Sequence, residues 1–318
     1  MITGIPRLSV LIITYNQEEL IKRAIDSLLA QRDYVYEICV SDDCSSDKTW
    51  EVLKSYEQQY PGLFKLNRNE PNLGIFANYE KTWTMPSGDI VYVLSGDDEC
   101  PRGWFKTAVD FIAQQQIDYL NEYFAVYGDY EARYPNGDSF VFTNSAIETG
   151  IDPVRLSIRG IIGNRSAVCS KKVVDSYKVV SRGKSHIAES AQDRQLPLFS
   201  KKVYYIPQVG NIYYTRIGVS ANIDAEKLKE REDIETYAMG VLQENGYQAV
   251  RSDIAYVKLQ DAKTKSYRLK SLSHRFKILK LFFASFDPVV SFRAFRIKRY
   301  IFAILQRMPH NKPIKMKI

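Results

Sequence analysis

Apolar residues in the N-terminal part of the chain form short continuous runs, and amphipathic segments separate them. Residues 8–14 read Leu-Ser-Val-Leu-Ile-Ile-Thr, a run typical of a strand that is buried on both faces of a parallel sheet. Further short runs predict strands at 36–40, 64–66 and 90–94. The intervening segments carry apolar residues at helical spacing, beginning near Gln17, Trp50 and Gly74. This β-α-β-α order predicts an α/β fold with a doubly wound, mostly parallel sheet.

Polar clusters follow three of the predicted strands. They are Thr14-Tyr15-Asn16, Asp42-Asp43 and Asp97-Asp98. Ligands of such sheets bind outside the carboxyl ends of the strands, so we expect a site there. Adjacent acids repel each other and persist most easily when a cation or a hydroxyl-rich ligand lies between them. For residues 95–99 the alternative is a solvated turn before a helix, because Pro101 suits a first helical turn.

Known nucleotide-binding loops are missing from the sequence. No GxGxxG follows the first strand, which argues against a dinucleotide-dependent dehydrogenase, and no GxxxxGK[ST] occurs, which argues against a P-loop enzyme. The Gly-rich loop that nucleotidyltransferases use after their first strand is also missing. The phosphates of a nucleotide would therefore have to be bound in another way, and a metal ion on paired carboxylates is the obvious candidate.

Four segments resemble, in order, the motifs of family 2 glycosyltransferases. They read Ser-Val-Leu-Ile-Ile-Thr-Tyr-Asn at 9–16, Val-Ser-Asp-Asp-Cys-Ser-Ser-Asp-Lys-Thr at 40–49, Asn-Leu-Gly-Ile-Phe-Ala-Asn at 72–78 and Ser-Gly-Asp-Asp at 95–98. The resemblance implies a GT-A fold and a nucleotide-diphospho-sugar donor, and we expect a UDP-sugar. It also implies a divalent cation, Mn²⁺ or Mg²⁺, and inversion at the anomeric carbon.

The resemblance also implies roles for individual residues. Tyr15 would pack on the base, and Asp43 would accept a hydrogen bond from the base imide. Asp97 would touch the ribose or the sugar, and Asp98 would bind the metal. The other residues of these motifs that we expect in the donor site are Thr14, Asn16 and Asn78.

Two further candidates lie later in the chain. The family places an acidic pair near the acceptor hydroxyl, often Glu-Asp, and this sequence has Gln192-Asp193, which leaves Asp193 as the candidate base. An inverting transfer needs a carboxylate to take the acceptor proton. The alternative is a helix-surface acid paired with Arg194 or Lys201. Arg216 lies where the family often has a basic residue near the diphosphate, and it is either a bidentate phosphate clamp or an ordinary surface arginine.

The middle of the chain is rich in aromatic residues. Residues 119–150 contain these and a Pro135-Asn136-Gly137-Asp138 turn, which predicts an edge strand after it. The aromatic rings could line an acceptor cleft, because such rings stack on sugars. We favour the simpler interpretation, packing against the sheet.

Composition narrows the class of protein. The 318 residues are 45% hydrophobic and 25% charged, as in an ordinary globular protein. The four cysteines form no CxxC pair and adjoin no histidine cluster, which argues against zinc and disulfide frameworks and favours a reducing cytosol. The N-terminus lacks the features of a signal peptide, and no apolar stretch reaches the roughly 18 residues of a spanning helix.

Charge divides the chain into two unlike parts. Residues 251–318 carry 17 Lys and Arg against three acids, whereas residues 1–250 carry 27 against 34. On a helix, 292–307 would place arginines on one arc and large apolar residues on the other, which favours an anionic membrane surface. Nucleic-acid binding is not expected, because it would not require so many exposed apolar groups. Docking on the catalytic domain or on a second subunit is the other alternative.

We therefore expect a GT-A-like domain over 1–225 and a helical basic region over 226–318. Residues 224–245 are expected to form a charged helical linker whose charge run is a solvated face. The expected function is transfer of a sugar to a hydroxyl of a saccharide or lipid-linked saccharide acceptor in surface polysaccharide synthesis. We expect the protein in the cytoplasm, peripheral on the inner face of the cell membrane. The alternatives are an inactive saccharide-binding or scaffolding protein of the same fold and a nucleotidyltransferase.

Overall fold

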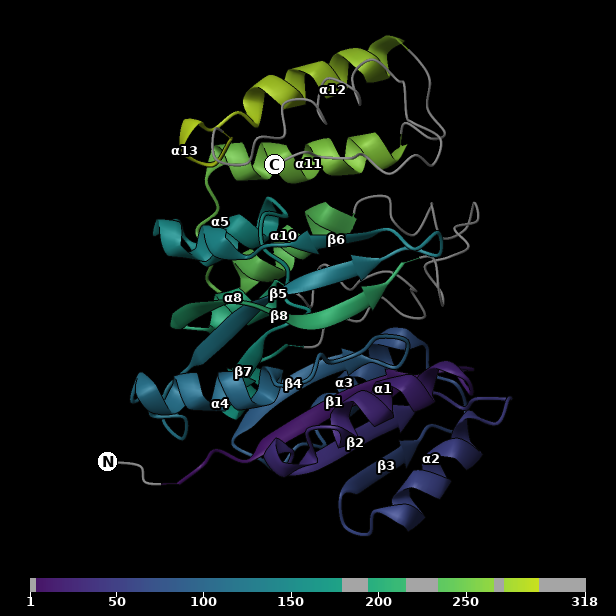
Figure 1. Cartoon of the computed structure of the whole chain (residues 1–318). Helices are drawn as coiled ribbons and strands as arrows, with labels where there is room; N and C mark the ends of the chain where they lie inside the picture. Colours follow the sequence, from purple (N-terminus) through teal and green to yellow (C-terminus); the bar gives the residue numbers. More distant parts are fainter. Residues whose placement is uncertain (1–3, 179–193, 216–233, 266–271, 292–318) are drawn as a thin grey trace.

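One mixed sheet of eight strands runs through the protein (Figure 1). The computed structural model describes residues 4–178, 194–215, 234–265 and 272–291. The strand order is β3-β2-β1-β4-β7-β5-β6, and β8 pairs with β5. The strands are β1 (Leu8–Thr14), β2 (Glu37–Asp42), β3 (Phe64–Arg68), β4 (Ile90–Ser95), β5 (Phe124–Arg133), β6 (Ser139–Phe142), β7 (Val168–Ser170) and β8 (Lys202–Tyr214).

The N-terminal half of the sheet is parallel, as the sequence pattern predicts. β1 pairs in parallel with both β2 and β4, and β2 pairs in parallel with β3. The helices between them are α1 (Leu20–Leu29), α2 (Thr49–Gln59) and α3 (Ile75–Trp83). The predicted strand at 8–14 matches β1, and the one predicted at 36–40 begins one residue later and continues to Asp42. The mostly parallel α/β fold with helices in the C-terminal region is confirmed.

The other half of the sheet is mostly antiparallel. β7 pairs antiparallel with β4 and β5, and β5 forms a hairpin with β6 at the end of the strand order. Gly137 in the hairpin turn has a φ of 86°, which glycine adopts without steric cost. The predicted turn and edge strand are therefore confirmed. Among the nearby aromatic residues, Phe124 and Tyr127 are fully buried while Phe140 is 41% exposed, so packing accounts for some of them and not for all.

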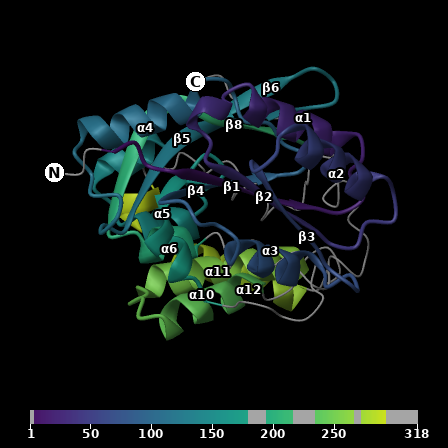
Figure 2. The same ribbon diagram turned by 90° about the horizontal axis from the view of Figure 1, so that it is seen from below.

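Helices cover both faces of the sheet (Figure 2). Alternate residues of β1 point to opposite faces, as a pleated strand requires. Val10 and Ile12 belong to the core that includes residues of α1 and α4 (Trp104–Gln114). Leu11 belongs to a second core, built with residues of α3 and of two short helices, α6 (Lys171–Asp175) and α8 (Gln195–Phe199). Both faces of β1 are therefore buried, which explains its unbroken apolar sequence.

The C-terminal region contains four described helices. They are α10 (Ile234–Glu244), α11 (Arg251–Lys265), α12 (Leu272–Ala284) and α13 (Pro288–Ser291). Of these, α10 and α11 pack on α5 (Pro153–Ile158). Met239 and Leu242 of α10 share a core with Val257 of α11 and Ile158 of α5. The charges at 226–232 on which the linker prediction rests lie outside the described residues. The described part of the linker, α10, is helical as predicted, and its apolar residues face this core. The domain boundary at 225 lies outside the described residues and stays a prediction.

A cluster of ion pairs holds α11 against α5. Asp253 is fully buried, and it accepts hydrogen bonds from Nε of Arg155 and Nε of Arg159, both at 2.8 Å. Arg155 Nη2 also bonds Asp287 at 2.7 Å, and Arg159 Nη1 donates to the carbonyl of Ser285 at 2.8 Å. The first part of the basic region is thus joined to the sheet domain by charge pairs as well as by apolar packing. Among the described helices, none is both long and apolar enough to cross a bilayer.

Candidate functional site

The strand order reverses beside β1, where β2 and β3 lie on one side and β4 lies on the other. In open α/β sheets the crevice at such a switch point, outside the carboxyl ends of the strands, is where ligands bind. Ile13 near the end of β1 and Ser95 at the end of β4 line a cavity of about 120 Å³ at this place. The fold therefore puts a cavity where the topology predicts a binding site.

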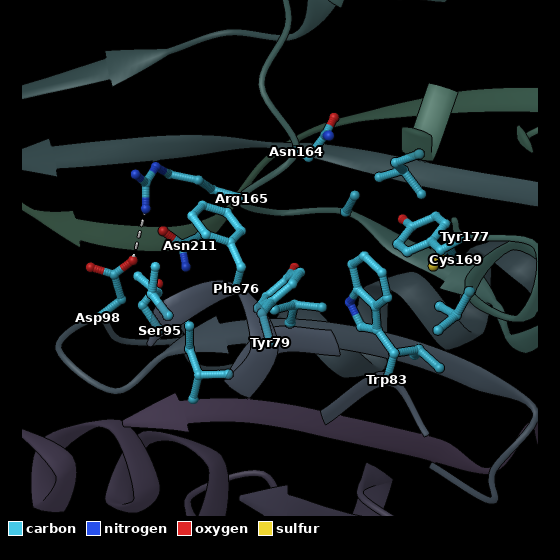
Figure 3. Close-up of a pocket in the computed structure, with 17 residues that line it drawn as sticks. Phe76, Tyr79, Trp83, Ser95, Asp98, Asn164, Arg165, Cys169, Tyr177 and Asn211 are labelled. Carbon is cyan, nitrogen blue, oxygen red and sulfur yellow. Dashed lines mark hydrogen bonds and ion pairs between the residues drawn. The ribbon is translucent and has the colours of Figure 1, made fainter. Parts of the chain in front are cut away.

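The cavity has a polar end and an aromatic end (Figure 3). Asp98, Arg165 and Asn211 lie at the polar end. Trp83 and Tyr177 lie at the other, with their ring centroids 4.7 Å apart and nearly perpendicular. Trp83 is 8% exposed, and among the described residues its indole N–H has no hydrogen-bond partner. The cavity can thus offer both charge and flat apolar surface, the combination that a sugar with a phosphate group requires.

Asp98 is the central charged group of the polar end. Its side chain is 1% exposed, and its Oδ2 lies 3.2 Å from Nη1 of Arg165. Its Oδ1 accepts a long hydrogen bond, 3.3 Å, from the backbone N–H of Tyr214. Burial raises the pKa of Asp98 to about 7, although the Arg165 charge opposes the shift, while the Asp97 charge adds to it. A buried carboxylate with such weak compensation is well suited to receive a cation.

Strand β8 holds the partners of Asp98 in place. Glu99 and Ile212 exchange two backbone hydrogen bonds, of 3.1 and 2.8 Å, which fix the end of β8 beside the Asp97–Asp98 turn. The guanidinium of Arg165 lies 3.9 Å from the ring centroid of Tyr213, within cation–π range. Sequence reasoning assigned no role to Arg165. The signal available was that residues 163–169 resemble the family's segment between the metal-binding motif, here 95–98, and the catalytic base.

Asp97 is half-buried, and its carbonyl oxygen accepts a hydrogen bond from Nη2 of Arg23. Arg23 in turn lies 3.6 Å from the ring centroid of Tyr214. The structure therefore surrounds the two adjacent carboxylates with arginines from α1 and from the segment before β7. This environment differs from the solvated turn that was the alternative for residues 95–99, because Asp98 is buried.

The acidic pair fits a divalent cation when a diphosphate supplies further ligands. Magnesium sites of this kind use one or two carboxylates together with substrate phosphates. Within the described ranges no group of three or more His, Cys, Asp or Glu side chains could hold a metal by itself. Asp97 and Asp98 provide hard oxygen donors, and the raised pKa of Asp98 shows that its ionised form lacks full compensation. The chain's own residues are thus compatible with an ion bound jointly with the donor.

At the end of β1, the three expected donor-site residues differ in exposure. Tyr15 is 44% exposed, so a ring face is available for stacking on a base. Asn16 has a φ of 52°, and its backbone N–H donates to Oγ of Ser45 at 2.9 Å while its Oδ1 accepts from the N–H of Ser46 at 2.8 Å. Thr14 is 3% exposed. Asn16 therefore fixes the loop after β2 beside Tyr15, and the hydroxyl of Thr14 donates to Oε1 of Gln17 at 2.8 Å.

Asp43 and Asn78 are both buried away from the cavity lining. Asp43 is 3% exposed and accepts from Asn69 Nδ2 and from the N–H groups of Leu73 and Gly74 at 2.8–2.9 Å. Three of the roughly four acceptor positions of its carboxylate are thus occupied. Asn78 is 2% exposed and bonds Asn69. Asp43 lies after β2 at the predicted edge of the sheet, and Asn78 lies on α3. The contact of Asp43 with a base and the place of Asn78 in the donor site stay predictions.

Asp193 and Arg216 lie outside the described residues, as does the predicted amphipathic segment at 292–307. The two partners that we considered for Asp193 are described. Arg194 is 6% exposed and pairs with Glu235 of α10, and the amine of Lys201 lies 4.7 Å from the ring centroid of Tyr123. The roles of Asp193 and Arg216 stay predictions.

Comparison with known proteins gives the family. The sequence profile of the family described as glycosyl transferase family 2 matches residues 9–172 of this chain. An uncharacterised glycosyltransferase of Mycoplasma genitalium is 32% identical over 121 residues, which are 36% of this chain and 41% of that protein. The chain spans 27–41% of the length of the curated relatives that it matches first.

Two solved structures share the fold. Staphylococcus aureus TarS 1-349, in complex with UDP-GlcNAc, has a TM-score of 0.58 and 14% identity, with 94% of this chain and 81% of that chain covered. Mannosyltransferase PcManGT from Pyrobaculum calidifontis, in complex with GDP-Man and Mn²⁺, has a TM-score of 0.51 and 15% identity, with coverage of 96% and 87%. At these identities the likeness concerns the fold, which is of the GT-A type. With the family match, it follows that the chain belongs to glycosyl transferase family 2.

Proposed function

We propose that this protein is an inverting, metal-dependent glycosyltransferase. It moves a sugar from a nucleotide-diphospho-sugar, with a UDP-sugar as the first donor to test, to a hydroxyl of a saccharide or lipid-linked saccharide. The observation that carries the proposal is the buried, incompletely compensated Asp98 on a cavity at the switch point of the sheet. The complexes of TarS with UDP-GlcNAc and of PcManGT with GDP-Man and Mn²⁺ support the choice of donor class and cation.

In this proposal the chain's residues divide the work. Asp98, with Asp97 beside it, holds a cation that neutralises charge on the diphosphate. Arg165 lies 3.2 Å from Asp98 and offers the phosphates a second positive charge at the cavity. Asp193 takes the proton from the acceptor hydroxyl as that oxygen attacks the anomeric carbon, and the bond from this carbon to the diphosphate breaks, so that the nucleoside diphosphate leaves. Tyr15, 44% exposed, stacks on the base, and Arg216 contacts the diphosphate.

The acceptor is the less defined partner. The aromatic end of the cavity, with Trp83 and Tyr177, supports a sugar ring or another group with an apolar face and a hydrogen-bond acceptor for the indole N–H. A role in surface polysaccharide synthesis, at the cytoplasmic side of the membrane, remains our prediction from the sequence. No observation favours the scaffolding or nucleotidyltransferase alternatives.

The proposal is tested by separating donor binding from chemistry. Asp193→Asn should retain donor affinity but lower Mn²⁺-dependent transfer or donor hydrolysis by roughly 10²–10⁴-fold, because a lost general base costs about that factor. Asp175→Asn, an exposed acid at the end of α6, is the matched control and should behave as wild type. Affinity is measured by calorimetry and turnover by release of nucleoside diphosphate.

The outcomes separate the alternatives. Near-normal turnover of Asp193→Asn would show that the base lies elsewhere, and Glu189, the acid four positions before Asp193 in the sequence, would be the next candidate. If a panel of nucleotide sugars with Mn²⁺ gave neither binding nor hydrolysis in the wild type, the proposed activity would be wrong. Formation of a nucleotide sugar from a nucleoside triphosphate and a sugar phosphate would instead identify a nucleotidyltransferase.

A further inference from the structure

Helix α12 lies at the end of the molecule farthest from β3 and α2, with α11 beneath it (Figure 1). One side of α12 packs inward. Ile278 is 5% exposed and shares a core with Leu259 and Ala262 of α11. His274 is 7% exposed, and its Nε2 lies 2.9 Å from the carbonyl oxygen of Ala262. These contacts fix which side of α12 points away from the protein.

The outward side exposes large aromatic residues. Phe276 is 69% exposed and Phe283 is 67% exposed. They are seven residues apart, close to two turns of an α-helix, so their side chains lie on one line along α12. Phe286, just after the helix, is 50% exposed. Rings exposed to this extent and gathered on one face mark an interaction surface.

Basic residues flank these rings. Arg275, Lys277 and Lys280 are exposed, and α12 contains no acidic residue. Lys280 lies between Phe276 and Phe283 along the helix, about 40° around the axis from Phe276. We call Phe276, Lys277, Lys280 and Phe283 the α12 outer face.

This pattern selects one kind of partner. A helix with aromatic residues between lysines and arginines suits the interface of an anionic bilayer, where the rings enter the headgroup region and the cations meet lipid phosphates. Nucleic acid would use the charges and leave the rings in water. A second copy of the chain would bring two basic faces together, and like charges across an interface oppose association.

We propose that the α12 outer face docks the protein on an anionic lipid surface. The proposal goes beyond sugar transfer, and it concerns described residues other than the 292–307 segment that the sequence alone suggested. Because α12 is joined through α11 and the Asp253 ion pairs to the sheet domain, docking here also fixes the orientation of the cavity relative to the bilayer.

The test is vesicle sedimentation of the full-length protein without donor or acceptor, so its result is independent of the proposed enzyme activity. Vesicles contain phosphatidylcholine with or without about a quarter phosphatidylglycerol. The wild type should bind the anionic vesicles. Raising NaCl from about 0.1 to about 0.5 M should lower the bound fraction, because salt screens the charges, and a salt-resistant bound fraction should remain because the rings stay buried in the bilayer. The double variant Phe276→Ser/Phe283→Ser should lower partitioning by at least about tenfold.

A second double variant and a matched control separate the electrostatic part of vesicle binding from the apolar part. Lys277→Gln/Lys280→Gln should lose most of the salt-sensitive part and keep the salt-resistant remainder. Phe140→Ser/Val141→Ser changes two apolar residues of β6, 41% and 47% exposed, and should sediment like the wild type. All changed side chains are exposed, so circular dichroism and melting temperature should stay unchanged in each variant.

Two outcomes would overturn the proposal. Sedimentation of Phe276→Ser/Phe283→Ser equal to that of the wild type would place the lipid contact elsewhere, for example in residues 292–318. Absence of wild-type binding to anionic vesicles, together with a dimer that this variant abolishes, would assign the face to a second copy of the chain.

Discussion

Asp98 and Asp253 are both buried aspartates that face arginines, yet their surroundings differ. Asp253 accepts close hydrogen bonds from two guanidiniums, at 2.8 Å from each Nε, and packs between α11 and α5. Asp98 has one arginine at 3.2 Å and one backbone N–H at 3.3 Å, and it adjoins a cavity. The first carboxylate is compensated by the close charges of two arginines, whereas the second has weaker compensation and adjoins space for a ligand.

The difference separates two roles. Asp253 is a structural carboxylate that holds α11 against α5, which we call the brace, and Asp98 is a carboxylate that can bind a ligand, which we call the binding group. A fully paired buried carboxylate costs much to disturb, because removal of one partner leaves the remaining charge uncompensated. A poorly paired one already carries that cost, and burial accordingly raises the pKa of Asp98 to about 7. Such residues cluster at functional sites, where a ligand supplies the missing charge. Changes at the two aspartates should therefore affect different properties of the protein.

The largest effect should follow Asp98→Ala. This variant should lose Mn²⁺-dependent donor binding, by more than the roughly 10–100-fold that loss of an outer-shell partner costs, because the cation loses a direct ligand. Calorimetric titration of a UDP-sugar with and without Mn²⁺ measures it. Asp253→Asn, at a temperature where it stays folded, should bind the donor as the wild type does. Equal metal-dependent affinity of Asp98→Ala and wild type would remove Asp98 from the site.

Asp253→Asn should be the more damaging change for stability. We expect a loss of roughly 3–5 kcal/mol in the free energy of unfolding. The neutral amide removes the negative charge that compensates the guanidiniums of Arg155 and Arg159, and these positive charges stay largely buried. Urea unfolding provides the measurement. Asp110→Asn is a suitable control, since Asp110 pairs with Lys106 on the surface of α4 and such pairs contribute at most about 1 kcal/mol. If Asp253→Asn lost no more stability than Asp110→Asn, the ion-pair cluster would not be what holds α11 against α5.

The smallest effect concerns the pH dependence of stability at Asp98. Its pKa in the folded protein is about 7, above the ordinary value of 3.8, so between these pH values the folded state holds a proton that the unfolded state has released. The native state therefore loses stability as pH rises through this window, and the loss stops above pH 7. An asparagine at position 98 does not titrate, so the Asp98→Asn variant should lack this pH dependence.

The melting temperature of Asp98→Asn relative to wild type, without metal, should accordingly rise from pH 5 to pH 7 and level off by about pH 8. Differential scanning calorimetry can follow it. A difference that stays constant with pH would contradict the raised pKa.

Much of the sheet domain follows from local patterns. The continuous apolar run at 8–14 predicted β1, because a strand between two others and covered on both faces admits few polar residues. Thr14, Asp43 and Asp98 could be grouped at one edge because parallel strands bring their carboxyl ends together. The interpretation of 224–245 rested on charged residues and gave no role to Met239 and Leu242 of α10, which are buried.

The sequence by itself determined the order of elements, the family resemblance and the edge of the sheet that carries the acids. Only the tertiary structure decided which acid is closely paired with arginines. Arg165 is 67 positions from Asp98, and Arg155 is 98 positions from Asp253. Periodicity is set by neighbours within a few residues, whereas these pairings depend on how distant segments cross the sheet. For that reason the sequence could name the carboxylates, and only the fold could distinguish the brace from the binding group.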